Sequence, residues 1–230
     1  MSDRLAIVIP TLNEAANIPF TLASVREGWA DAEVVVADGG STDDTGDLAS
    51  AFGAKVCRDL PKSRGSQLRA GAREAGDVDW LLFLHADTRL DEAAVEAAKA
   101  YMTSANARLA MFQLRFDDAS RFLRFSAWWT RFDSVFTRFG DQGILVTRSA
   151  YEALGGFRAI PLFEDVDLLR RARKTRPIDV LPASVTTSSR RFRTHGIWRQ
   201  QLHNAVLLLR FLAGVSPEKL VRNYPPAAKL

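Results

Sequence analysis

A short apolar run that ends in a histidine, a carboxylate and a hydroxyl limits most strongly what this chain can fold into. Leu81–Leu84 is continuously apolar, and His85-Ala86-Asp87-Thr88 follows it directly. An apolar run of this length is typical of a strand buried on both faces, as in parallel sheets. Ligands bind at the carboxyl ends of such strands, which favours a functional role for Asp87. The alternative is that Asp87 only caps a helix that begins near Asp91.

Four strand–helix units precede about residue 105. Strands are predicted over 5–9, 33–36, 54–58 and 81–84, with helices over 18–27, 44–52, from about 62 to 74, and 91–104. This alternation predicts an α/β fold with a mostly parallel central sheet flanked by helices. The ends of three predicted strands carry polar side chains, namely Thr11 with Glu14, Asp38, and His85 with Asp87. Because such ends converge at one edge of a sheet, we expect a Rossmann-like nucleotide-binding half.

The remainder of the chain has a different character. Strands are predicted over 108–116 and 144–147 and near 180 and 185–187, helices over 149–154, from 164 and over 197–212, and a polar loop over 188–196. Between 121 and 139, aromatic residues recur at spacings of three and four: Phe122, Phe125, Trp129, Phe132, Phe136 and Phe139. This stripe predicts one helix packed on the sheet. Ligand binding and contact with a membrane surface are the alternatives.

Composition excludes several classes of protein. The 230 residues are 47% apolar and 25% charged, which are ordinary globular values. The net charge of +4 (31 − 27) favours anionic ligands but does not indicate nucleic acid. The single cysteine, Cys57, excludes a disulfide framework. With no signal-peptide pattern and no apolar run of ~18 residues, we expect no transmembrane helix and a cytoplasmic protein, soluble or peripheral at the inner face of the membrane.

The residue types at the predicted sheet edge suit a hard divalent cation. Mg²⁺ and Mn²⁺ prefer carboxylate and phosphate oxygens and often take only one or two ligands from protein. Asp87 suits this role, and His85 lies on the same face of an extended strand. Lys62, Arg64 and Arg69 either offset phosphate charge at a helix start or are merely solvated. Neither a GxxxxGK[ST] loop nor a GxGxxG after the first strand is present, which disfavours a dinucleotide oxidoreductase.

Four short motifs follow one another between residues 5 and 173. They are Ile9-Pro10-Thr11-Leu12-Asn13-Glu14, Ala37-Asp38-Gly39-Gly40-Ser41-Thr42-Asp43, Leu84-His85-Ala86-Asp87 and Glu164-Asp165. In this order they resemble the signature of family 2 glycosyltransferases with the GT-A fold. The resemblance implies that the first two motifs hold the nucleoside of a nucleotide sugar, with Thr11, Glu14 and Asp38 at the matching positions.

The resemblance also implies roles at the reacting end of the site. Asp87 would hold a divalent metal, Mg²⁺ or Mn²⁺, against the donor diphosphate, with His195 as a second metal ligand. Asp165 would be the catalytic base, with Glu164 beside it to orient a substrate. Gly140–Gly143 resembles the segment beside the donor sugar. Further substrate-binding positions are predicted at Arg64, Gln67, His85, Gln142, Arg190 and Arg191.

Two positions depart from the family pattern. His85 replaces the first carboxylate of the family's DxD motif, which leaves one strong protein ligand for the metal. Gly39 stands where many relatives have a second Asp. Within the family, Gly140-Asp141-Gln142-Gly143 and Ser188-Ser189-Arg190-Arg191 are similar to a bacterial subgroup of arsenosugar-biosynthesis or selenodomain-associated transferases.

The function implied is transfer of a sugar from a nucleotide-diphosphate sugar, in the first place a UDP-sugar, to an unknown acceptor hydroxyl by metal-assisted inverting displacement. Residues 1–230 would form one domain, with a donor half (1–105), an acceptor half (106–213) and a C-terminal extension at the surface (214–230). A nucleotidyltransferase acting on sugar phosphates is one alternative, although Pro10–Glu14 lacks the glycine- and arginine-rich loop expected there. A non-catalytic nucleotide-sugar-binding protein at the membrane surface is another.

Overall fold

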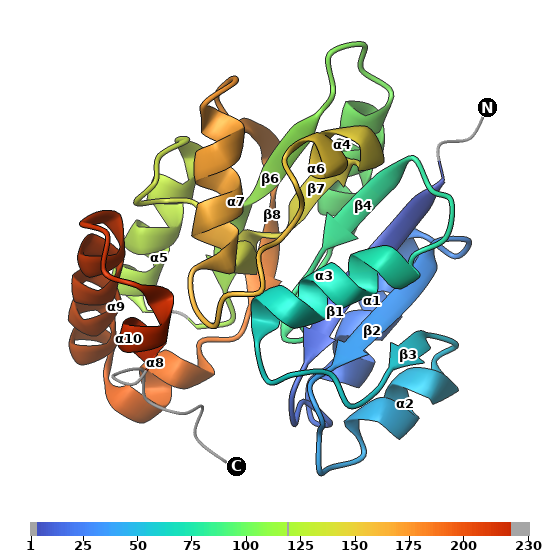
Figure 1. Ribbon diagram of the computed structural model, residues 1–230, viewed down its shortest axis with the longest axis horizontal. Helices are drawn as coiled ribbons and strands as arrows, with labels where there is room; N and C mark the ends of the chain where they lie inside the picture. The colour runs from blue at the N-terminus through green and yellow to red at the C-terminus, as the bar shows by residue number, and fades with distance from the viewer. Residues whose placement is uncertain (1–3, 119, 222–230) are drawn as a thin grey trace.

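The computed structural model describes residues 4–118 and 120–221, without the side chains of Arg191, Thr194, His195, Ile197 and Trp198. Its strands form one sheet in the order β3-β2-β1-β4-β7-β6-β8-β5 (Figure 1). The strands are β1 (Leu5–Thr11), β2 (Glu33–Asp38), β3 (Lys55–Cys57), β4 (Trp80–Phe83), β5 (Thr88–Arg89), β6 (Leu109–Phe116), β7 (Ile144–Thr147) and β8 (Asp179–Thr187). The α/β fold predicted from the alternating pattern is confirmed.

Parallel pairing of the first strands brings their carboxyl ends to one edge. Strand β1 pairs in parallel with β2 and with β4, and its last residue, Thr11, lies opposite Asp38. Strand β7 runs antiparallel between β4 and β6, while β6 and β8 are parallel to each other. The motifs that follow β1, β2 and β4 therefore meet at the same edge of the sheet.

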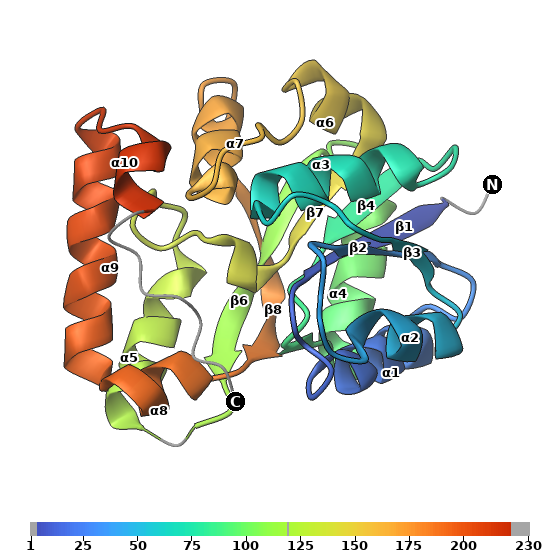
Figure 2. The same ribbon diagram turned by 60° about the horizontal axis from the view of Figure 1, so that its bottom comes forward.

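Helices cover both faces of the sheet (Figure 2). They are α1 (Ile18–Gly28), α2 (Thr45–Ala51), α3 (Arg64–Glu74), α4 (Glu92–Met102), α5 (Arg121–Trp128), α6 (Arg148–Ala153), α7 (Glu164–Arg173), α8 (Arg190–His195), α9 (Ile197–Leu212) and α10 (Pro217–Val221). Side chains alternate along a strand, so Ile7 and Ile9 pack with α1, α2 and α4. Ala6 and Val8 pack on the other face with α3, α6 and α7.

The aromatic stretch after β6 differs from the prediction of one helix over 121–139. Helix α5 ends at Trp128, and short 3-10 turns follow at Trp129–Arg131 (η1) and Gly140–Gln142 (η2). The Thr130 hydroxyl donates to the carbonyl of Ala127 and accepts the N–H of Leu114 in β6. This side chain ties the end of the helix to the neighbouring strand, so the chain turns instead of continuing the helix.

Three further predictions need correction or refinement. The stretch 188–196 is not a loop, because α8 forms there with the Ser189 carbonyl accepting the N–H groups of Phe192 and Arg193. Strand β8 runs without a break where two short strands were predicted. In the predicted surface extension 214–230, α10 buries Leu220, while 222–230 lie outside the described residues. No helix in the described part of the chain has the length and apolar character to cross a membrane.

We predict that Gly71→Ala destabilises the fold although alanine favours helices. A Cβ at Gly71 in α3 would lie 2.4 Å from Val8 Cγ1 in β1, both in the core. Overpacking of about 1–3 kcal/mol should outweigh the gain in helix propensity of roughly 1 kcal/mol. Urea denaturation should therefore show a lower free energy of unfolding. The control is Gly46→Ala in α2, where the Cβ meets only the flexible Arg58 guanidinium and stability should hold or rise.

Candidate functional site

Asp38 closes the loop that follows β2. Its carboxylate accepts hydrogen bonds from Thr11 Oγ1 at 2.9 Å and from the backbone N–H groups of Gly40 and Ser41 at 3.2 and 2.9 Å. Gly40 has a φ of +79°, in the left-handed region that glycine adopts without strain. Asp38 itself is only 5% exposed. The predicted nucleoside-binding residues Thr11 and Asp38 are thus in direct contact and fix the shape of this loop.

Gln67 braces the ends of two strands. Its Nε2 donates to the carbonyl oxygens of Thr11 at 2.6 Å and Ala37 at 3.0 Å. A Cβ at Gly39 would lie 2.8 Å from the same Nε2, which gives a physical reason for glycine at this departure from the family pattern. The predicted substrate-binding amide of Gln67 is therefore bound to the protein backbone in this structure.

Glu14 links the first motif to α8, which lies 176 positions further along the chain. Its Oε1 accepts from Arg190 Nη2 at 3.1 Å, and its Oε2 accepts from Asn17 Nδ2 at 2.6 Å. Two of the predicted substrate-binding residues, Glu14 and Arg190, therefore lie together. The side chains of Arg191 and His195, on the same helix, lie outside those that the structure describes, so their predicted roles stay predictions.

His85, Gly140 and Asp165 meet beyond the end of β4. The backbone N–H of Gly140 donates to Asp165 Oδ2 at 2.5 Å, and the N–H of Val166 donates to Oδ1 at 2.7 Å. A Cβ at Gly140 would lie 3.0 Å from His85 Nε2, so the backbone passes close to the imidazole. Backbone donors therefore hold the Asp165 carboxylate at the start of α7.

Glu164 is buried beside this carboxylate. It is 3% exposed, and its Oε1 lies 3.8 Å from Arg64 Nη1. Burial raises the pKa of Glu164 to about 7, and the negative charge of Asp165 adds to the rise while Arg64 opposes it. The two acids of the Glu-Asp pair therefore differ in environment: one carboxylate is hydrogen-bonded by backbone and the other lies in the protein interior.

Asp141 is a site residue that sequence reasoning missed. No described residue hydrogen-bonds to its buried Oδ1. Burial, together with the negative charges of Asp165 and Asp87, raises the pKa of Asp141 to about 7. Asp165 and Asp87 therefore both lie close enough to Asp141 to repel its carboxylate. The available signal was its place inside the 140–143 segment, where the prediction singled out Gln142 instead.

Gln142 and Arg138 form a buried support beneath this segment. Gln142 Oε1 accepts from Arg138 Nη1 at 2.7 Å, and its Nε2 donates to the Thr137 carbonyl at 2.6 Å. Arg138 also donates to the Phe112 carbonyl of β6 at 2.7 Å. Burial lowers the pKa of this guanidinium to about 10. Both ends of the Gln142 amide, predicted to bind substrate, are used within the protein.

Asp87 does not cap α4, because the side chain that accepts from the Ala94 N–H at 2.9 Å is that of Asp91. Among the described residues, no group of three or more His, Cys, Asp or Glu side chains has the arrangement of a metal site. A divalent cation is nevertheless compatible with this edge. A positive charge would relieve the repulsion of Asp141 by Asp165 and Asp87, and phosphate oxygens can supply the remaining ligands.

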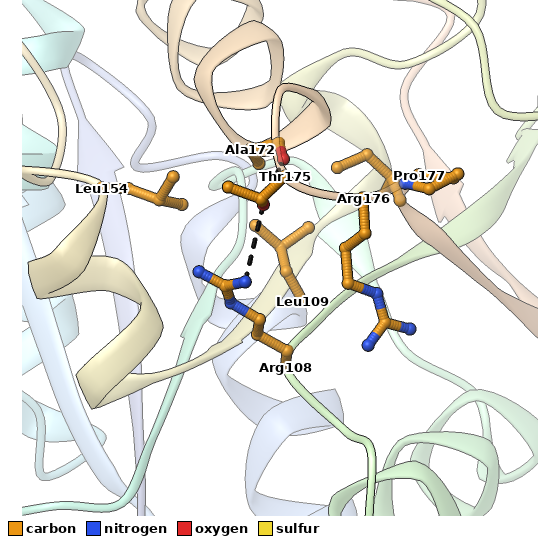
Figure 3. A pocket seen from close by; sticks show the side chains of 8 residues that line it. Arg108, Leu109, Leu154, Ala172, Thr175, Arg176 and Pro177 are labelled. Atoms are coloured by element: carbon orange, nitrogen blue, oxygen red, sulfur yellow. Dashed lines mark hydrogen bonds between the residues drawn. The ribbon is translucent and has the colours of Figure 1, made fainter.

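The small pocket drawn in Figure 3 does not lie at this candidate site. Figure 3 shows that Arg108, Leu109 and Thr175 are among its lining residues, with Arg108 Nη1 3.5 Å from Thr175 Oγ1. These residues lie at the start of β6 and beyond the end of α7. Strand β7 is antiparallel to both β4 and β6, so β6 runs in the same direction as β4. The start of β6, and the pocket with it, therefore lies at the edge of the sheet opposite Asp38 and Asp87.

Solved structures share this fold. A mannosyltransferase from Pyrobaculum calidifontis, in complex with GDP-Man and Mn²⁺, has a TM-score of 0.71 at 18% identity, covering 95% of this chain and 67% of that one. Glucosyl-3-phosphoglycerate synthase from Mycobacterium tuberculosis, with Mn²⁺, UDP and glucosyl-3-phosphoglycerate, has a TM-score of 0.62 at 18% identity, covering 93% and 81%. TarS of S. aureus with UDP has a TM-score of 0.65 at 14% identity, covering 90% and 64%.

Sequence comparison gives the family. A PGL/p-HBAD biosynthesis glycosyltransferase of Mycobacterium bovis is 41% identical over 95 residues, which cover 38% of this chain and 37% of that protein. The Mycobacterium tuberculosis protein of the same name matches equally. The match thus spans little more than a third of these relatives. The family model described as Glycosyl transferase family 2 matches residues 6–160, and the chain therefore belongs to this family, with the GT-A fold.

Proposed function

We propose that this protein transfers a sugar from a nucleotide-diphosphate sugar, in the first place a UDP-sugar, to an acceptor hydroxyl. The observation that carries the proposal is the position of Asp165. Two backbone N–H groups hold this carboxylate at the start of α7, where its neighbour Gly140 also passes close to His85. A carboxylate thus lies next to the sheet edge that would receive the donor, which supports Asp165 as the base. The GDP-Man and UDP bound by solved structures of this fold support a nucleotide-sugar donor.

The donor would occupy the half formed by residues 1–105. Thr11, Glu14 and Asp38 would contact the nucleoside, and Arg64 would lie close to the phosphates. The hydrogen bonds from Gly40 and Ser41 to Asp38 support this assignment, because a loop already held in one shape loses little conformational freedom on binding. Residues 106–213 would supply the acceptor side, and the ion pair of Glu14 with Arg190 joins the two.

We propose that Asp87 holds Mg²⁺ or Mn²⁺ against the donor diphosphate, with His195 as a second ligand. A bound cation would stabilise negative charge that grows on the leaving group. His85 would lie beside the diphosphate. The Mn²⁺ in two solved structures of this fold supports a divalent ion.

We propose inverting displacement at the anomeric carbon. The acceptor oxygen forms the new bond to carbon as the bond to the diphosphate oxygen breaks, and Asp165 takes the acceptor proton. Glu164 orients the acceptor or donor from its buried position. The narrower resemblance to arsenosugar-biosynthesis or selenodomain-associated transferases rests on the segments 140–143 and 188–191. A cytoplasmic location, with peripheral contact at the inner face of the membrane, completes the proposal.

We predict that Asp165→Asn lowers turnover by about 10²–10⁴-fold while nucleotide binding persists, because the amide cannot accept the proton. The assay is release of nucleoside diphosphate from UDP-, GDP- and dTDP-sugars, and binding is measured by calorimetry. Asp47→Asn, on exposed α2, is the matched control and should keep full activity. Wild-type turnover in Asp165→Asn would rule out this base. Binding without release in the wild type would favour the non-catalytic alternative.

A second prediction concerns the metal. After treatment with EDTA, activity should return on titration with Mn²⁺ or Mg²⁺. His85→Asp adds a carboxylate beside Asp87, so half-maximal activity should need roughly tenfold less Mn²⁺, which corresponds to about 1.4 kcal/mol. Asp87→Asn should need a higher Mn²⁺ concentration for half-maximal activity than the wild type. Asp91→Asn, which changes the cap of α4, is the control and should need the same concentration as the wild type. Activity that ignores both EDTA and Mn²⁺ would assign Asp87 to donor orientation instead.

A third prediction follows from the raised pKa of Glu164. Between pH 4.5, the ordinary pKa of a glutamate, and about pH 7, the Glu164 carboxyl loses its proton in the unfolded chain but keeps it in the folded chain. The unfolded state then binds fewer protons, so stability falls as pH rises through this window. Glu164→Gln removes the effect, and its unfolding free energy relative to the wild type should rise from pH 4.5 to 7 and then level off. Equal pH curves for Glu164→Gln and the wild type would contradict the assignment.

A further inference from the structure

Helix α9 presents an apolar face to solvent. Leu202, Val206 and Leu209 are 69%, 46% and 56% exposed, and their spacings of four and three place them on one side of the helix. Leu207 and Leu208 are buried at 2% and 5% on the other side. A surface helix of a globular protein normally turns polar side chains outward. An exposed apolar row of this kind therefore indicates a partner.

A second exposed apolar group lies on α5 and η1. The exposed fractions are 59% for Phe125, 43% for Trp128, 46% for Trp129 and 50% for Phe132. The rings pack on one another, with centroids 5.2 Å apart for Trp128 and Trp129 and 5.3 Å apart for Trp128 and Phe132. In α5 it is Leu123, at 1% exposure, that enters the core. The aromatic stripe thus forms a cluster at the surface instead of packing on the sheet.

The two groups belong to one end of the molecule. Figures 1 and 2 both show α5 and α9 side by side, at the end opposite β3 and α2. We call the exposed apolar side chains of α5, η1 and α9 the end surface. It combines two tryptophan rings with aliphatic side chains, the composition typical of proteins that lie in the interface of a bilayer.

The charged side chains of α5, η1 and α9 are all arginines. Arg121, Arg124 and Arg131 are exposed in α5 and η1, as are Arg199 and Arg210 in α9. Neither α5 nor α9 contains an acid. Within the described part of the chain, none of these five arginines forms an ion pair. Arginine stems cover apolar surface while their guanidinium groups reach outward to phosphate oxygens.

We propose that the end surface docks on a lipid bilayer that contains anionic headgroups. Anionic lipid complements both parts of the surface, because the acyl region receives the apolar rings and the headgroups neutralise the arginines. A second copy of the chain fits less well. A two-fold contact would set the same five arginines of each copy against one another, with no acid on either helix to compensate.

The docked helix also touches the candidate site. The ring of Phe211, near the end of α9, packs at 5.0 Å on the ring of Phe163, the residue before Glu164. Arg170 of α7 lies over the same Phe211 ring. On the proposed function, the acceptor hydroxyl would thus be met close to the headgroups. Docking itself does not require that function, because it depends only on the end surface.

Flotation with vesicles tests the proposal. The full chain should bind vesicles of phosphatidylcholine with phosphatidylserine, bind weakly to phosphatidylcholine alone, and be released by salt. Leu202→Gln and Leu209→Gln should each lower partitioning about tenfold, and Arg124→Gln and Arg210→Gln about fivefold each. Phe52→Gln in the turn after α2 and Arg73→Gln on α3 are matched controls at other surfaces and should bind as the wild type does.

The outcomes separate docking from catalysis. All six variants should release nucleoside diphosphate from the donor at the wild-type rate when no vesicles are present, so a loss of binding with intact release supports the proposal. Equal binding of the four end-surface variants and the controls would overturn it. Absence of binding at low salt would overturn it as well. A dimer in sedimentation that Leu202→Gln and Leu209→Gln abolish, without vesicle binding, would assign the surface to self-association.

Discussion

The hydrogen bond from the Gly140 N–H to the Asp165 carboxylate is the contact on which the site depends. It joins η2, which follows the long aromatic excursion from β6, to the start of α7. Glycine leaves room for this approach, because a Cβ would lie only 3.0 Å from His85 Nε2 and 3.2 Å from Asp165 Oδ2. The buried Arg138 fixes η2 through Gln142, so a network of uncharged and cationic donors positions an anion at the edge of the sheet.

A second link joins two segments that are distant in the sequence, at residues 14 and 190, at this edge. The ion pair between Glu14 and Arg190 is only partly exposed, at 18% and 24% of the side chains, and so it is shielded from solvent more than most surface pairs. Parallel strands alone bring Thr11, Asp38 and Asp87 together, whereas the later residues reach them through β7, β6 and β8. Strand pairing thus positions Thr11, Asp38 and Asp87, whereas side-chain contacts such as that of Glu14 with Arg190 position the residues from later in the chain.

The alternation of apolar runs and helical periods was enough to predict the α/β fold and most element positions. Strand β7 and helix α9 were predicted with the boundaries that the structure has. Predictions failed where a long-range contact overrides local pattern. The aromatic helix ends early because Thr130 bonds to β6. Sequence spacing also does not reveal that Gln67 Nε2 and both ends of the Gln142 amide form hydrogen bonds within the protein. The predicted roles of these two residues in substrate binding stay predictions.

The contact between Phe163 and Phe211 has a consequence for how the protein is assembled. Phe163 has a φ of +63°, a conformation that costs a residue other than glycine about 1–2 kcal/mol. It is held where α9 supplies an aromatic partner. During synthesis the sheet strands emerge first and α9 among the last elements. The sheet edge would therefore form early, while the Asp165 carboxylate at the start of α7 acquires its final orientation only once α9 has packed.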